Sequence, residues 1–265
     1  MSSFLSKFLA FFRKDVQIAL SYKFNILLQI ILIIFIISLI FFSAVSSDGA
    51  NFENSEFLKI LVGIALIDFM FSSMSVFSRE VRFAQTYGTF EALILTKTSI
   101  ITILLSSYAL TFSRSVFRIL IYILISKFIF GVGVALSNIP IFLVLVIYTC
   151  IPFIGIGLFA ASFIILFKVG NVISFFVAIS SIFFSGIFFP LDTIPEYLAK
   201  ISNNLPLTIG SDIAQQALLN NFILKAAFPD LLKILYMSVL FVPTGILLVY
   251  YSLKEAKRNG NLNYY

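Results

Sequence analysis

The chain has 265 residues, of which 60% are hydrophobic and 11% are charged, and its formal net charge at pH 7 is +6. It contains no histidine and one cysteine, Cys150, which excludes histidine-based metal or haem sites and an intrachain disulfide. The apolar residues recur in blocks of about 20, the length at which a helix crosses the ~30 Å hydrocarbon layer of a bilayer. Because helices satisfy their backbone polar groups locally, the composition predicts an all-α polytopic membrane protein.

Residues 1–23 do not resemble a cleavable signal peptide, because basic and apolar residues alternate along them at helical spacing. Lys14 and Gln17 fall on one side of such a helix, whereas Phe8, Phe12 and Val16 fall on the other. This pattern favours an amphipathic helix in the membrane interface. An inward extension of the first span is the alternative.

Six apolar segments are long enough to be predicted as spans, within a single membrane domain that fills residues 1–265. Their ranges are 24–45, 57–78, 100–126, 139–166, 172–190 and 231–251. In the fourth of them, Pro152, Gly155 and Gly157 indicate a bend or close helix packing.

The distribution of charge predicts the orientation of these spans. With the N-terminus in the cytoplasm, the inner segments hold most of the lysines and arginines, and the outer segments hold most of the acids. Both termini are then cytoplasmic, which suits a bacterial or archaeal plasma (inner) membrane. Because the basic charge is spread over several inner segments, it indicates contact with anionic membrane lipids and no nucleic-acid partner.

The predicted inner loop, residues 79–99, is long for a connection within a helix bundle. Its chain breaks at Gly88 and resumes with Phe90 and Glu91, and Thr89 is positioned to cap a short helix that ends near Thr96. A short amphipathic helix with an exposed acid would suit the docking of a soluble partner. An ordinary interfacial loop explains the pattern equally well.

The predicted outer stretch, residues 191–222, is apolar but interrupted. Thr193 and Glu196 form a capping box with Pro195 in the first turn, and a second short helix restarts at Pro206. Neither helix is long enough to span the bilayer. We therefore expect a re-entrant hairpin that forms a lid over a translocation path, with a surface hairpin as the alternative.

Three charged residues fall well inside predicted spans, away from the span ends, namely Asp68 in the second and Arg114 and Arg118 in the third. A charge at the centre of a spanning helix costs ~2.5–3.5 kcal/mol on insertion scales, which disfavours unpaired charges in lipid. Counting inward from the ends of the antiparallel spans predicts that Asp68 pairs with Arg114. Such a pair would either pin two helices together or belong to a polar patch that lines the path. Arg118 has no obvious partner in the sequence, which makes it the candidate for contact with a substrate or lipid phosphate.

Two of these segments carry a family resemblance. The inner segment GTFEALILTKTS begins at Gly88, and the outer segments are SGIFFP at 185–190, Ile194-Pro195 and Leu205-Pro206-Leu207-Thr208. They are similar to the G-T-x-E-x-L-x-x-T-P-x-S, S-G-x-x-F-P, P and L-P-L-T patterns of the ABC-2 permeases, the membrane subunits of type 2 ATP-binding-cassette exporters. The resemblance covers the whole length in order, although Lys97 stands where that family usually has proline.

This resemblance implies that two six-span subunits, either identical or paralogous, pair around a central path. Each subunit would bind a cytoplasmic ATPase, and that partner would hold the ATP and Mg. The inner loop would be a coupling helix set in a groove of the ATPase and braced by the N-terminal helix. In this analogy Glu91 is the charged contact and Phe90 and Leu93 pack beside it. The implied coupling residues are Gly88, Thr89, Phe90, Glu91, Leu93, Arg13 and Lys14, and the implied outer gate comprises Ser185, Gly186, Phe189, Pro190, Pro195, Pro206 and Thr208.

The sequence contains no G-x-x-x-x-G-K-[ST] phosphate loop, so we do not expect this chain to hydrolyse ATP by that route or to hold a cofactor. The leading expectation is the membrane subunit of an ATP-driven exporter of amphipathic, lipid-like, drug or glycan cargo. The alternatives are a membrane anchor that transports nothing and an ion-coupled secondary transporter that uses Asp68. A membrane enzyme is least favoured, because the sequence shows no cluster of nucleophile, base and metal ligand.

Overall fold

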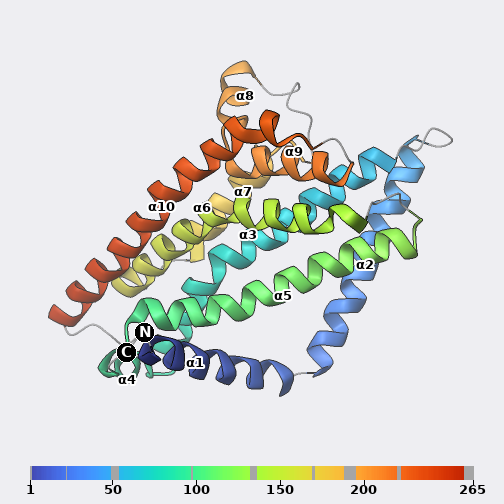
Figure 1. Cartoon of the computed structure of the whole chain (residues 1–265). Helices are drawn as coiled ribbons and strands as arrows, with labels where there is room; N and C mark the ends of the chain where they lie inside the picture. The colour runs from blue at the N-terminus through green and yellow to red at the C-terminus, as the bar shows by residue number, and fades with distance from the viewer. Residues whose placement is uncertain are drawn as a thin grey trace.

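A computed structural model describes residues 2–21, 23–48, 54–96, 98–131, 136–168, 171–187, 195–219 and 222–259. All the regular elements in these ranges are helices (Figure 1). In chain order they are α1 (Ser2–Ser21), α2 (Lys23–Asp48), α3 (Asn54–Thr86), α4 (Phe90–Leu95), α5 (Ile100–Phe128), η2 (Leu136–Asn138), α6 (Ile139–Phe167), α7 (Asn171–Phe183), α8 (Glu196–Ser202), α9 (Pro206–Leu218) and α10 (Leu224–Arg258).

Within the described residues, four helices are long and apolar enough to cross a membrane. They are Phe57–Thr86 of α3, then α5, α6 and α10. Two shorter apolar segments, Leu27–Phe42 in α2 and Val172–Phe183 in α7, accompany them. The chain is therefore a polytopic helical membrane protein, and the count of six spans stays a prediction.

Several helix boundaries differ from those that the sequence predicts. The second span was expected to end at residue 78, but α3 continues to Thr86 and includes the first basic residues of the expected inner loop. The sixth span was expected from residue 231, but α10 begins at Leu224. α7 ends at Phe183, and residues 188–190 of the expected fifth span lie outside the described residues. Polar residues that follow an apolar run can extend its helix, so hydrophobicity marks the lipid-facing length and not the helix end.

α6 lies at the centre of the bundle between α3 and α10, and two glycines allow the close approach. A Cβ atom at Gly155 would lie 2.3 Å from the carbonyl carbon of Phe241 in α10. On another side of α6, a Cβ atom at Gly157 would lie 2.8 Å from the carbonyl oxygen of Met74 in α3. The close packing that these glycines predict is confirmed, because only a residue without a side chain leaves room for the neighbouring backbones.

The main hydrophobic core joins α2, α3, α5, α6, α7 and α9 through large buried side chains such as Phe57, Phe69, Phe142 and Phe153. A second core occupies the end of the bundle that carries α4, and a third lies beneath α9 and the start of α10. The two ends of the bundle thus have separate cores, and α3 and α6 run between them.

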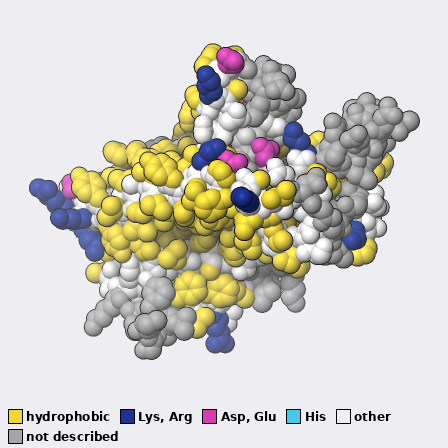
Figure 2. Space-filling view, turned by 45° about the horizontal axis from the view of Figure 1, so that its top comes forward, with side chains coloured by type: hydrophobic (Ala, Val, Ile, Leu, Met, Phe, Trp, Pro, Cys, Tyr) yellow, Lys and Arg dark blue, Asp and Glu magenta, His cyan; other side chains and the backbone are white. Residues whose placement is uncertain are grey.

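The outer surface is apolar as well. On α10 the exposed side chains include Tyr236, Val239 and Leu247. Figure 2 shows hydrophobic side chains in a broad continuous patch, with Lys and Arg gathered at the left end of the view, where α10 ends. An exposed apolar surface of this extent suits contact with lipid, because water-soluble monomers rarely leave such a surface uncovered.

α1 packs along α5, and its described side chains are divided as the sequence predicts. Phe8, Phe12 and Val16 are half-buried, whereas Lys14 and Gln17 are exposed. The amphipathic character of this helix is confirmed. Its position in the membrane interface stays a prediction.

Candidate functional site

The turn between α3 and α4 is built on Gly88. The amide of Thr89 donates to the carbonyl of Ala84 at 2.9 Å, and the amide of Gly88 donates to the carbonyl of Gln85 at 3.2 Å. Gly88 has φ +67°, in the left-handed region that favours glycine. These are the two hydrogen bonds of a Schellman motif, which ends α3 and redirects the chain into α4.

Thr89 occupies the N-cap position of α4 but does not cap it with its side chain. Its hydroxyl donates instead to the carbonyl of Ala84, at 3.3 Å, and so reinforces the preceding turn. The expected short helix is present and ends at Leu95, close to the predicted end. The prediction of a side-chain cap is wrong, because Thr89 has helical backbone angles, which turn its hydroxyl back towards α3.

α4 has one buried side and one exposed side. Phe90 is 1% exposed and lies in the core that α3, α5, α6 and α10 share, and Leu93 is partly buried against the same core. Glu91 and Leu95 are exposed, and Leu95 is 78% accessible. The resemblance implies that Phe90 packs beside Glu91 in the coupling surface. In the structure the Phe90 side chain anchors α4 to the core of its own chain, and its part in coupling stays a prediction.

The exposure of Leu95 was not predicted from the sequence. Its place one turn after Glu91 on a six-residue helix could have indicated that the two side chains lie on the same side. The chain after α4 is tied to α10 by a 3.0 Å hydrogen bond between the hydroxyls of Ser99 and Tyr250.

Arg13 and Lys14 lie on the exposed side of α1, away from the core that holds α4. Their expected part in coupling therefore stays a prediction.

Replacing Gly88 with alanine should destabilise the turn by about 1–2 kcal/mol, because an L-residue is strained at φ +67°. No atom lies within 4 Å of a Cβ built at this position, so the strain arises from the backbone alone. Faster amide hydrogen exchange in α4 would report it. Gly88→Asn should be milder, since asparagine tolerates this conformation, and equal exchange in both variants would contradict the backbone explanation.

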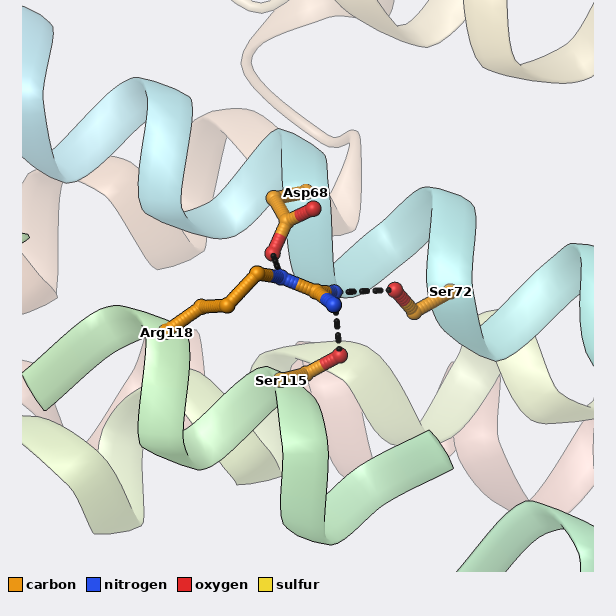
Figure 3. Close-up of polar contacts among 4 residues, drawn as sticks. All are labelled: Asp68, Ser72, Ser115 and Arg118. Atoms are coloured by element: carbon orange, nitrogen blue, oxygen red, sulfur yellow. Dashed lines mark hydrogen bonds and ion pairs between the residues drawn. The ribbon is translucent and has the colours of Figure 1, made fainter. Parts of the chain in front are cut away.

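A polar cluster joins α3 and α5 in the apolar middle of the bundle (Figure 3). The Arg118 Nε donates to the Asp68 Oδ2 at 2.8 Å. The Arg118 Nη2 donates to the hydroxyls of Ser72, at 3.0 Å, and Ser115, at 2.9 Å. The guanidinium of Arg118 thus contacts one carboxylate and one hydroxyl on α3 and one hydroxyl on its own helix.

This geometry corrects two expectations. The carboxylate of Asp68 pairs with Arg118, which had been left without a partner, and not with Arg114 as predicted. Arg114 lies one turn earlier on α5, where its side chain is exposed. The side chains of Asp68 and Arg118 are 28% and 20% exposed, so the pair is largely enclosed. Its direct bond from helix to helix supports a role in holding α3 against α5.

At the end of the bundle opposite α4, the backbone carbonyl of Phe184 links three helices, α7, α8 and α9. It accepts hydrogen bonds from the hydroxyls of Ser202, at the end of α8, and Thr208, in α9. Gly186 has φ +71°, and Ser185 donates through its hydroxyl to the carbonyl of Ile182 in α7. A tight turn after α7 therefore brings this carbonyl to the two hydroxyls.

α9 is buried between α6 and α3, although it is too short to span the bilayer. Pro206 and Thr208 are buried, and Gly210 packs so closely on Thr149 of α6 that a Cβ atom would collide with it. The Asn138 amide group donates to the carbonyl of Ala217 at 2.8 Å. Protein atoms thus surround the broken backbone at this end of the bundle, which a short helix inside a membrane requires.

The outer gate and the re-entrant hairpin stay predictions, and the structure shows where the residues named for them lie. Ser185, Gly186, Pro206 and Thr208 gather around the carbonyl at the end of α7, whereas Phe189 and Pro190 lie outside the described residues. Pro195 had been expected in the first turn of α8, but it is the N-cap residue of that helix. The contact of Ser202 was not predicted from the sequence, because a lone serine in a short helix does not indicate which carbonyl its hydroxyl contacts.

The fold and these sites define the class of the protein: an integral membrane protein built of packed helices, with a short anchored helix at one end and a buried short helix at the other. A family model of ABC-2 type transporters matches residues 6–219. The chain therefore belongs to the ABC-2 type transporter family and is a membrane component of a transporter. A comparison with curated proteins gave no match.

Proposed function

We propose that this chain is the transmembrane subunit of an ATP-driven exporter and that a separate cytoplasmic ATPase energises it. Membership of the ABC-2 family supports a transport role, and the sequence has no phosphate loop of its own. The observation that carries the proposal is the construction of α4. Phe90 fixes this helix in the core while Glu91 and Leu95 point outward, as a docking helix requires.

The end of the bundle that carries α4 is assigned to the cytoplasm. Arg79 and Arg82 at the end of α3 and Lys254, Lys257 and Arg258 at the end of α10 are exposed there. Cytoplasmic segments of membrane proteins carry an excess of lysine and arginine. α8 and α9 then lie on the outer side, and both ends of the chain lie inside, in a multi-pass plasma membrane protein.

Force applied to α4 reaches the bundle through shared side-chain packing. Phe90 packs into the same core as Val81 of α3, Leu104 of α5 and Leu253 of α10. α3 continues unbroken from this core to the outer half, where Gly63 lies directly beneath Ile187 of the turn after α7. A rigid helix that contacts both ends suits the transmission of nucleotide-driven movement to an outer gate.

The path itself is proposed to form between two such subunits, either two copies or a pair of paralogues. The outer gate is the group of hydroxyls around the carbonyl of Phe184, where α7, α8 and α9 meet. The direction of transport, from the cytoplasm outward, follows from the family resemblance of this outer segment. The exposed apolar side chains of α7, such as Val172, Phe175 and Phe176, favour amphipathic cargo.

Glu91→Arg should lower the ATP turnover of the assembled complex at least about tenfold, which corresponds to about 1.4 kcal/mol of lost coupling. The substitution reverses the charge on the exposed side of α4 and leaves the Phe90 anchor in place. ATPase activity and copurification of the partner ATPase, measured in lipid nanodiscs, report the effect.

Glu255→Arg is the matched control, because it reverses an acidic charge at the same end of the bundle but on α10. It should leave turnover within about twofold of the native complex, as expected of surface charges. Equal losses in both variants, or none in Glu91→Arg, would remove α4 from the coupling surface. A partner that copurifies without any nucleotide-dependent flux would favour the membrane-anchor alternative.

The ion-coupled alternative is less well supported. Asp68 lies midway along the predicted second span, and Arg118 binds its carboxylate directly. A coupling acid must exchange its ion during each cycle, and a guanidinium at 2.8 Å opposes that exchange. Flux driven by a proton or sodium gradient without nucleotide would reverse this preference.

A further inference from the structure

A cavity of about 760 Å³ lies between the end of α3 and the start of α7. It is separate from the α4 surface, the Asp68–Arg118 pair and the outer turn. Its wall comes from side chains between Phe71 and Thr86 of α3, from Tyr87 in the following turn, and from Val172, Ser174 and Phe175 of α7. A volume of this size admits one amphiphilic molecule or a large part of one.

The wall of the cavity changes character along α3. Phe71 and Met74 line its apolar part, and Arg79 and Arg82 follow towards the end of the helix. At 1.5 Å per residue, Phe71 and Arg82 are separated by about 16 Å along the helix axis. A ligand with an apolar chain and a charged head matches this gradient, with its head at the arginines.

The charged side chains among the described residues that line the cavity are all basic. Arg79 and Arg82 contribute two exposed guanidinium groups, and the described residues of the cavity wall include no aspartate or glutamate. In the part of the chain that the structure describes, the side-chain ion pairs join other residues and leave these two guanidinium groups without a carboxylate. Guanidinium groups bind phosphate oxygens through paired hydrogen bonds, so the head that fits here is a phosphate.

A third feature also points to a ligand. Ser174 is only 9% exposed, and its hydroxyl has no hydrogen-bond partner among the described residues. Ser174 belongs to the wall of the same cavity. Buried hydroxyls in proteins are normally hydrogen-bonded, so an ester carbonyl or hydroxyl of a bound lipid would satisfy this one.

From these observations we infer that the cavity binds an anionic phospholipid from the leaflet at the α4 end of the bundle. The phosphate lies between Arg79 and Arg82, and an acyl chain runs along Phe71 and Phe175 towards the middle of the membrane. The inference rests on the proposed function for the orientation of the chain. It deepens that function by giving the transporter a binding site for a phosphate-bearing amphiphile beside the cytoplasmic surface.

The absence of tryptophan from the sequence allows a direct binding measurement. In Phe175→Trp protein, the only tryptophan reports from the cavity wall. The protein is reconstituted in phosphatidylcholine vesicles with increasing brominated phosphatidylglycerol or, in parallel, brominated phosphatidylcholine. We expect the anionic lipid to quench the fluorescence with about tenfold higher apparent affinity, as two cations near a phosphate provide.

Two double variants in the Phe175→Trp background locate the site. Arg79→Gln/Arg82→Gln should abolish the preference for the anionic lipid while retaining quenching by the neutral one, which shows that the fold is intact. Lys254→Gln/Lys257→Gln removes the same charge from the same end of the bundle, on α10, and should retain the preference.

No preference in the Phe175→Trp protein, or an equal loss in both double variants, would overturn the inference. The first result excludes an anionic site, and the second assigns the preference to the general charge of this end of the protein. Neither measurement uses nucleotide or the ATPase. Failure of lipid binding is therefore distinguishable from failure of the Glu91 test, which measures turnover.

Discussion

Replacing Asp68 with alanine should lower the free energy of unfolding by about 2–3 kcal/mol, because Arg118 would remain largely buried without its counter-ion. The guanidinium would keep neutral partners such as the hydroxyls of Ser72 and Ser115, at 3.0 and 2.9 Å. Its charge lies among apolar helices, where neutral hydroxyls compensate it poorly. The partial exposure of both charged side chains keeps the effect below that of a fully enclosed pair.

Thermal unfolding of the purified protein in nanodiscs measures this effect. Asp230→Ala is the matched control, since Asp230 pairs with Lys233 at 2.7 Å on the surface of α10, where the side chains are 41% and 47% exposed. An exposed pair of this kind contributes less than about 1 kcal/mol. If Asp68→Ala were as mild as the control, the pair between α3 and α5 would not hold the two helices together.

The double variant Asp68→Leu/Arg118→Met separates the charge from the packing. Buried ion pairs can often be replaced by apolar side chains of similar volume with little loss of stability. We expect the double variant to be more stable than Asp68→Ala, because no unpaired charge remains. A double variant as unstable as the sum of the two single variants would show that the polar groups are themselves required.

Replacing Gly155 with leucine should have the largest effect on folding, a loss of more than about 3 kcal/mol from overpacking. The new Cβ atom would lie 2.3 Å from the carbonyl carbon and 2.4 Å from the carbonyl oxygen of Phe241. These are backbone atoms of α10, so no side-chain rotation relieves the clash. α6 and α10 would have to separate along the most extensive helix pair of the bundle.

Gly155→Ala should show the same defect in a weaker form, because it already places a Cβ atom against the Phe241 backbone. Ala226→Leu, at an exposed position on α10, adds a larger side chain without a neighbour to displace. Gel filtration and thermal unfolding of the three variants check the prediction. Native-like stability of Gly155→Leu would show that α6 and α10 lie farther apart than this packing requires.

The packing divides the bundle into a tight centre and a looser margin. α3, α6 and α10 approach one another closely at Gly155 and Gly157, whereas α7 contacts α3 over a shorter stretch and leaves the lipid-sized cavity beside it. We expect the tight centre to move as a unit when α4 is displaced. The margin along α7 then offers the surface that can open.

Several features follow from the sequence alone, because they depend on local chemistry. Long apolar runs determine membrane helices, since a backbone in lipid must satisfy its own hydrogen bonds. The alternation in residues 1–23 determines the two faces of α1. Gly88 determines the turn before α4, because other residues seldom adopt its positive φ, and Pro206 marks the first turn of α9.

Only the tertiary structure decided which side chains meet. Arg114 and Arg118 are one helical turn apart, so both satisfy the depth that the sequence predicts for a partner of Asp68. The packing of α5 on α3 selects Arg118. In the same way, the core beneath α4 decided that Phe90 faces inward.

The outer turn and the cavity were equally beyond the sequence. Ser202 and Thr208 reach one carbonyl because α7, α8 and α9 converge there, and Arg79 and Arg82 face a cavity because α3 continues past its apolar part. Composition and periodicity determine which surfaces of a helix are suited to face lipid, protein or water. The rotation, length and crossing of the helices arise from packing over the whole chain, and they determine the neighbours of each polar group.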